Sequence, residues 1–230
     1  MSYFTAESLG FLRGLARHNE KTWFEAHRGD YERHVKEPMA ELVREMDVRL
    51  SALAPEITGD PKRSMFRLHR DIRFSKDKSP YKANAACWFF HKRAGSRVGS
   101  EAEEGSAGFY FHLEPGRSMI GGGLWMPPKN SLGKIREAIA EKPRVFESVA
   151  RTLEKRFDGL DTEHMLKRMP QGFPETHPAA KWLKYQSFVS GRVIPDARVT
   201  GPQLGRVLEQ EFCALLPLVR FLNGAIGLQT

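Results

Sequence analysis

Apolar residues recur every three or four positions in the first quarter of the chain, as in amphipathic helices. The longest such stripe consists of Met39, Leu42, Val43, Met46, Leu50 and Leu53. Thr5 is placed to cap a first helix and Asn19 a second, while Pro38 suits the first turn of the long helix, with a break or kink before it. We therefore expect residues 5–54 to be helical.

The middle of the chain alternates between apolar and polar positions in short runs rich in aromatic residues, which favours strands. The candidate strands cover residues 65–74, 85–92, 108–114 and 118–125. Residues 94–108 are mostly glycine, serine and glutamate without a hydrophobic pattern, so we expect a mobile hairpin loop there. Residues 63–126 are thus predicted to form an antiparallel sheet that needs a helical layer on one face, which the first third can supply.

Residues 130–225 have a helical and mixed pattern. Ser131 is a candidate cap and Pro143 a candidate first residue of a helix, and a closing amphipathic helix is expected to end or bend at Pro217. Between them, residues 186–194 are predicted to add a strand at a sheet edge. The whole pattern predicts one α+β domain, residues 1–230, in which an antiparallel sheet of about four to six strands packs with helices.

Size and composition agree with this fold. The chain has 230 residues, 40% of them hydrophobic, and no linker that would divide it. No apolar stretch approaches the ~20 residues of a membrane span, and no hydrophobic run follows a basic segment at the start, so we expect a cytoplasmic protein without a membrane partner. Cys87 and Cys213 both have apolar neighbours and are expected to be buried free thiols.

Positive charge is concentrated in one short segment. The formal net charge is +8, and six cations lie between residues 67 and 82, opposed there only by Asp71 and Asp77. Arg70 stands out because it is in phase with apolar residues at positions 66, 68, 72 and 74 on one face of the predicted strand. A covered guanidinium needs a carboxylate, backbone carbonyls or a ligand anion.

Two interpretations of this cluster remain open: a structural network of ion pairs, or a basic pocket for a phosphorylated or carboxylated small molecule. In the second, Arg70 fixes the anion, Asp77 orients a neighbouring cation and Tyr81 donates a hydrogen bond. Further charge would come from Arg67, Arg73 and Lys76. The complete set of candidate binding residues is Arg67, Arg70, Asp71, Arg73, Lys76, Asp77, Lys78, Tyr81 and Lys82.

Other chemistry has weaker signals. The run of glycines at 121–123 lacks the GK[ST] of a phosphate-binding loop and favours a bulged or closely packed strand. His69, His91 and His112 lie on predicted strands, but their spacing matches no known metal signature, so we predict no metal or cofactor. Nucleic-acid binding is an alternative function, as is an enzyme acting on a phosphate-containing substrate; no residue is assigned a catalytic role, and the sequence does not indicate an oligomeric state.

Several strings together resemble a known family. They are FRLHRDIRFSKDKSPYK, GFYFHLEPGRSMIGGGLWMPP, IREAI, MPQGFPETHP and LKYQSF. In them the chain is similar, from about Phe11 to Leu222, to a bacterial and fungal family described as a domain of unknown function, DUF2461. The resemblance implies a single α+β domain and no assigned activity. The acidic, glycine-rich insert at 94–108 is where we expect this chain to differ from its relatives.

Overall fold

The computed structural model describes residues 2–71, 77–94 and 105–229. They form a single α+β domain around a five-stranded antiparallel sheet with strand order β1-β2-β3-β4-β5. The strands are β1 (Ile57–Thr58), β2 (Ala85–His91), β3 (Gly108–Leu113), β4 (Met119–Leu124) and β5 (Phe188–Val193). Each strand therefore pairs with its neighbours in the sequence. A short turn joins β3 to β4, whereas much longer segments join β1 to β2 and β4 to β5.

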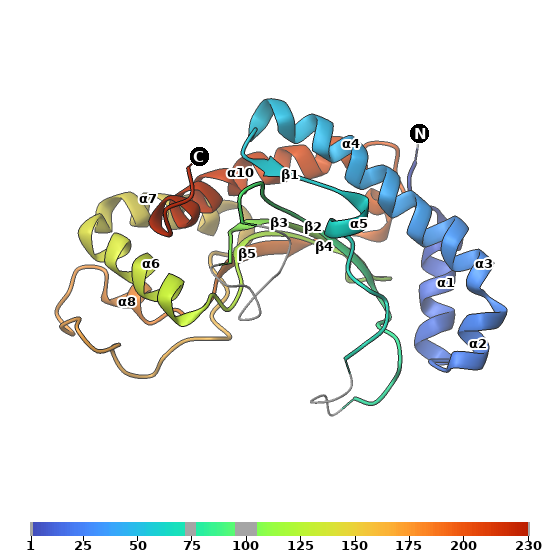
Figure 1. Cartoon of the computed structure of the whole chain (residues 1–230), viewed down its shortest axis with the longest axis horizontal. Coiled ribbons are helices and arrows are strands. Elements are labelled where there is room, and N and C mark those ends of the chain that lie inside the picture. The colour runs from blue at the N-terminus through green and yellow to red at the C-terminus, as the bar shows by residue number, and fades with distance from the viewer. Residues whose placement is uncertain (1, 72–76, 95–104, 230) are drawn as a thin grey trace.

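Helices make up most of the rest of the domain (Figure 1). In the first third they are α1 (Ala6–Arg17), α2 (Lys21–Ala26), α3 (Arg28–Tyr31), the π-helix η1 (Glu32–Lys36), α4 (Glu37–Leu53) and α5 (Pro61–Ser64). In the last part they are α6 (Lys129–Glu141), α7 (Pro143–Phe157), α8 (Ala180–Leu183), α9 (Asp196–Val199) and α10 (Leu204–Ala225). Figure 1 shows α4 and α10 together on one face of the sheet, with α1–α3 at one end of the molecule and α6–α8 at the other.

The face of the sheet that contacts α10 is its apolar face. The ring of Phe212 in α10 stacks on Phe109 of β3, with centroids 4.7 Å apart, and lies 5.6 Å from Phe89 of β2. At Gly122 of β4 an added Cβ would be 3.4 Å from the Cβ of Leu215 in α10, so the helix lies directly against the strand. The helical layer thus comes mainly from the last third of the chain, whereas the sequence suggested the first.

The opposite face of the sheet, here called the outer face, has a different composition. Because side chains alternate along a strand, the residues next to the apolar ones point to it. They include Trp88, Tyr110, His112, Met119, Gly121, Gly123, Val189, Gly191 and Val193. Most of these are partly exposed, and Val193 is 58% exposed, whereas Phe109, Phe111 and Ile120 on the other face are fully buried.

Buried polar groups fasten the sheet to the helices. Glu211 of α10 is 2% exposed and accepts bonds from Arg156 of α7 (2.9 Å) and from Arg192 of β5 (2.5 Å), which joins three elements. Asn223 is fully buried, and its amide pairs with both the N–H and the C=O of Ala107 just before β3. These contacts satisfy polar groups that would be costly to bury alone.

Most predicted strands are confirmed, but the one at 65–74 is wrong over its described part. Residues 65–71 form isolated bridges, Met65 with Cys87 and His69 with Tyr81, and β1 is a strand that the sequence did not indicate. Residues 72–74 lie outside the described residues, as do residues 95–104 of the predicted mobile loop. Described residues 105–107 at the end of that loop are buried.

Two predicted caps are also wrong. Thr5 does cap α1, but α2 begins at Lys21 with Glu20 as its N-cap, because the amide of Asn19 bonds to a distant backbone segment instead. Ser131 lies inside the first turn of α6, which begins at Lys129. The expected break before Pro38 is the π-helix η1, which leads directly into α4.

Of the two outcomes expected at Pro217, an end or a bend of the closing helix, the end is wrong; the burial expected for Cys213 is also wrong. Helix α10 does not end at Pro217 but continues to Ala225, because buried residues on both sides of the proline, including Leu216 and Leu218, hold it against the core. Cys213 is exposed rather than buried, since it follows Phe212 and is therefore turned away from the apolar stripe of the helix. Cys87 is buried, as predicted.

We expect Gly123→Ala to destabilise the protein. Gly123 has φ +125°, and an added Cβ would lie 2.0 Å from the carbonyl oxygen of Phe188 in β5. Backbone strain and the clash together should lower the free energy of unfolding by about 2 kcal/mol or more in urea denaturation. Gly133→Ala in α6 is the matched control, because an added Cβ there meets nothing within 4 Å and alanine favours a helix. Equal stability of the two variants would contradict this account.

Candidate functional site

The basic segment forms a projection that we call the arm, residues 65–71 and 77–84. It continues β2 beyond the sheet: the N–H of Phe66 donates to the carbonyl of Ala86, and the N–H of Lys82 donates to the carbonyl of Leu68. The bridge between His69 and Tyr81 lies further out. Alternation along these two antiparallel segments gives the arm two faces, one with His69 and Tyr81 and the other with Phe66, Leu68, Arg70 and Lys82.

The first face of the arm is docked on the N-terminal helices. The side chain of Asn19 accepts a bond from the N–H of Tyr81 and donates one to its carbonyl, both 2.9 Å long. The ring of Tyr81 stacks on Phe24 of α2 with centroids 4.5 Å apart, and the ring centroid of His69 lies 4.9 Å from that of Tyr81. The arm is therefore held by its backbone and by aromatic packing, and burial raises the pKa of the Tyr81 hydroxyl.

The second face of the arm carries two cations close together. Arg70 is 30% exposed; one of its terminal nitrogens lies 3.1 Å from the carboxylate of Asp77, but its Nε–H is buried and has no hydrogen-bond partner among the described residues. Lys82 is half-buried and forms no ion pair with a described residue. Burial, and then the charge of Arg70, lower the pKa of Lys82. Positive charge on this face thus exceeds what Asp77 neutralises.

The other predicted binding residues are not all on this face. Arg67, Asp71 and Lys78 are exposed, and Asp77 also accepts a bond from the N–H of Ser79, which together with Arg70 lowers the pKa of its carboxyl. Tyr81 is 2% exposed and packs in the core. Arg73 and Lys76 lie outside the described residues. Of the cluster, the structure brings together Arg70, Asp77 and Lys82.

Phe66 links the arm to the outer face of the sheet. Its ring centroid lies 5.7 Å from Nζ of Lys82 on one side and 6.0 Å from the ring of Tyr110 on the other. The Tyr110 hydroxyl lies 3.2 Å from Nδ1 of His112, and Nε2 of His112 lies 2.9 Å from the carbonyl oxygen of Arg117. The site therefore extends from the two cations across Phe66 to a hydrogen-bonded chain on β3.

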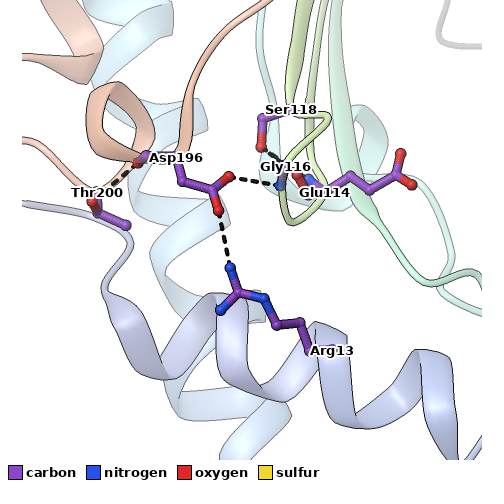
Figure 2. Close-up of polar contacts among 6 residues, drawn as sticks. All are labelled: Arg13, Glu114, Gly116, Ser118, Asp196 and Thr200. Atoms are coloured by element: carbon purple, nitrogen blue, oxygen red, sulfur yellow. Dashed lines mark hydrogen bonds and ion pairs between the residues drawn. The ribbon is translucent and has the colours of Figure 1, made fainter.

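The hairpin turn that carries the Arg117 carbonyl is fixed from two directions (Figure 2). The Ser118 hydroxyl accepts from the N–H of Glu114 and donates to its carbonyl. From the other side, the carboxylate of Asp196 accepts from the N–H of Gly116 (2.8 Å) and from Arg13 of α1 (3.0 Å). Figure 2 shows the Glu114 carboxylate pointing away from Asp196, and it lies 3.6 Å from Nε2 of His112.

Sequence reasoning missed the pairing of Tyr110 with His112. Both are on β3, two residues apart, and alternation puts both on one face, which was the available signal. In the sequence, His112 stands out only as one of three histidines on predicted strands. Within the described residues there is no group of three or more His, Cys, Asp or Glu side chains that could hold a metal ion, and no helix long and apolar enough to cross a membrane.

Away from the arm, a polar hollow of about 270 Å³ lies between α4 and the start of α10. Arg49 in its lining lies 2.7 Å from Glu45 and 2.6 Å from Glu209, and the Tyr3 hydroxyl donates to Glu45. The glycines at 121–123 form part of β4 in the middle of the sheet, which confirms the packed-strand interpretation.

Asn19→Ala should loosen the arm. The substitution leaves the N–H and C=O of Tyr81 without their partner, which should cost about 1–3 kcal/mol of unfolding free energy. Hydrogen exchange should show the Tyr81 amide exchanging at least ~5-fold faster, while amides of β3 change little. Asn130→Ala, at an exposed position of α6, serves as the control. Unchanged exchange at Tyr81 would show that Asn19 does not hold the arm.

Tyr110 should make stability fall at alkaline pH. Burial raises its pKa to about 12, above the ordinary value near 10, so the unfolded chain loses the proton first. The contribution of Tyr110 to the free energy of unfolding is complete below pH ~10 and is lost as pH rises toward 12. Urea denaturation should therefore show wild type losing up to about 2 kcal/mol more than Tyr110→Phe between these pH values. Parallel pH profiles for the two proteins would refute the assignment.

Comparison with known proteins gives one result. The family model described as "Conserved hypothetical protein (DUF2461)" matches residues 7–221, which include the arm, the sheet and the hairpin turn. No curated protein and no solved structure matches the chain significantly. The matched residues make up nearly the whole domain. The chain therefore belongs to the DUF2461 family of conserved hypothetical proteins.

Proposed function

We propose that this protein binds an anionic small molecule, phosphorylated or carboxylated, between Arg70 and Lys82. The observation that supports the proposal is the buried Nε–H of Arg70, which has no hydrogen-bond partner among the described residues. A buried donor without a partner is unusual in native proteins, because it has lost its bond to water and gained nothing. An oxygen of a ligand anion would supply the missing acceptor.

Charge supports the same conclusion. Arg70 and Lys82 repel each other strongly enough that Arg70 helps to lower the pKa of Lys82. Asp77 lies on only one side of Arg70 and is itself more than half exposed. A phosphate or carboxylate placed between the two cations would remove this repulsion and form charge-assisted hydrogen bonds with both.

Arg70→Leu should abolish binding while the protein stays folded. Isothermal titration with propyl phosphate, inorganic phosphate and succinate is expected to show saturable binding of at least one probe to wild type. Arg70→Leu should weaken that binding at least ~10-fold, since a charged hydrogen-bond pair is lost. Arg44→Leu is the matched control, because Arg44 is exposed on α4 and its loss changes the net charge equally.

Two further variants keep the proposal falsifiable. Arg70→Lys retains the charge but removes the Nε–H, and Lys82→Met removes the second cation, so both should also weaken binding. No binding of any probe to wild type, or equal weakening by Arg44→Leu, would overturn the proposal. So would binding of oligonucleotides alone with a steep dependence on salt, which would indicate a nucleic-acid-binding protein instead.

A further inference from the structure

Tyr110 stands beside a stretch of the outer face that has no side chains. On β4 its direct cross-strand partner is Gly121, and the partner of Gly121 on β5 is Gly191. The nearest atoms that an added Cβ at Gly121 would meet are backbone atoms of β5, the carbonyl oxygen of Ser190 at 3.0 Å and the Cα of Gly191 at 3.7 Å. On the outer face next to Tyr110, two successive strands thus have glycine and no side chain.

At Gly191 a side chain is excluded by the backbone itself. An added Cβ would lie 2.5 Å from the carbonyl oxygen of Ile120 and 2.8 Å from the Cα of Gly121. Close packing of β4 and β5 therefore requires glycine there, so no side chain of these strands stands directly across from Tyr110. The arm lies on the other side of Tyr110, next to β2, and Phe66 connects the two because it contacts both Lys82 and Tyr110.

The hydrogen-bonded chain on β3 fixes the direction of the Tyr110 proton. The carbonyl of Arg117 can only accept, so Nε2 of His112 carries the hydrogen that it receives. In the neutral imidazole Nδ1 is then an acceptor, and the Tyr110 hydroxyl donates to it. The phenol oxygen of Tyr110 can therefore only accept a hydrogen bond from a further partner. It stays protonated at neutral pH, because burial raises its pKa to about 12.

We propose that Tyr110 selects, among small anions, those that also carry a hydroxyl group, by accepting a hydrogen bond from that hydroxyl. This inference rests on the proposed function and adds the ligand class: a hydroxylated phosphate or carboxylate, such as a polyol phosphate or a hydroxy acid. Arg70 and Lys82 present only donors and bind the anion, whereas Tyr110 presents only an acceptor and binds the hydroxyl. The carbon chain of the ligand lies between them, along the ring of Phe66, which contacts both Lys82 and Tyr110.

His112 is a positioning residue in this arrangement. It contacts Tyr110 and not the ligand, and it acts by accepting the hydrogen bond from the phenol O–H. The Arg117 carbonyl that orients it is fixed by the turn that Ser118 and Asp196 hold. The carboxylate of Glu114 lies 3.6 Å from Nε2 of His112.

Three phosphates of equal charge test the proposal. Glycerol 3-phosphate has two hydroxyls, propyl phosphate has none, and glycerol 3-phosphate methylated on both hydroxyls can accept but not donate. At about pH 8, wild type should bind glycerol 3-phosphate about 3–10-fold more tightly than propyl phosphate. The methylated compound should bind no better than propyl phosphate.

Tyr110→Phe should abolish this preference and leave the dissociation constant for propyl phosphate within about 2-fold of wild type. His112→Ala should make the methylated compound bind more tightly than propyl phosphate, because the Tyr110 hydroxyl is then free to donate to an ether oxygen. If His112 has a purely structural role, its replacement would not change this selectivity. Phe157→Leu, at a buried position in α7 away from the site, controls for general loss of packing.

The outcomes separate the two proposals. If propyl phosphate binds in an Arg70-dependent way but glycerol 3-phosphate binds no better, the inference about Tyr110 is overturned and the anion site stands. If the methylated compound binds as tightly as glycerol 3-phosphate, the assigned proton direction is wrong and the proposal falls. If none of the three phosphates binds wild type, the hydroxyl selection fails. If inorganic phosphate and succinate do not bind either, the anion site fails with it.

Discussion

Gly122 lets α10 lie directly against the central part of β4, with the Cβ of Leu215 only 3.4 Å from where a side chain would begin. Phe212, three residues earlier on the helix, can then stack on Phe109 of β3. A larger residue at 122 would push the helix away and separate this apolar layer. The same strand has a glycine on its outer face at Gly121, so the middle of the sheet is thin on both sides, and Tyr110 of the candidate site lies beside this thin part.

Two residues near the N-terminus, Arg13 and Asn19, each brace one end of the candidate site. Arg13 in α1 reaches Asp196, which holds the hairpin turn behind His112. Asn19, in the short connection to α2, holds the arm that carries Arg70 and Lys82. The cations and the Tyr110 chain come from segments far apart in the sequence, and their relative position depends on these supports. Preorganised groups of this kind lose less freedom when they bind a ligand.

The sequence revealed what depends on local periodicity. Alternation identified β2 to β5, and the three-to-four spacing identified α1, α4, α7 and α10, because burial of one face imposes these periods. It also put Arg70 on the same face as Phe66 and Leu68. It could not reveal that Asn19 bonds to Tyr81, 62 residues away, or that the segment after Met65 leaves the sheet as an arm. Those features depend on which surfaces meet, and no local pattern encodes that.

Asn19 holds the arm through hydrogen bonds to the main chain of Tyr81, so the attachment does not depend on which side chains the neighbouring positions carry. Pro80 and Lys82 flank Tyr81, and the side chain of Lys82 points to the opposite face of the arm. Residue 82 can therefore change, and with it the charge on this face of the arm, while the attachment of the arm stays the same. The residue that anchors the arm and the residue that sets its charge are separate, so a single substitution can alter one without the other.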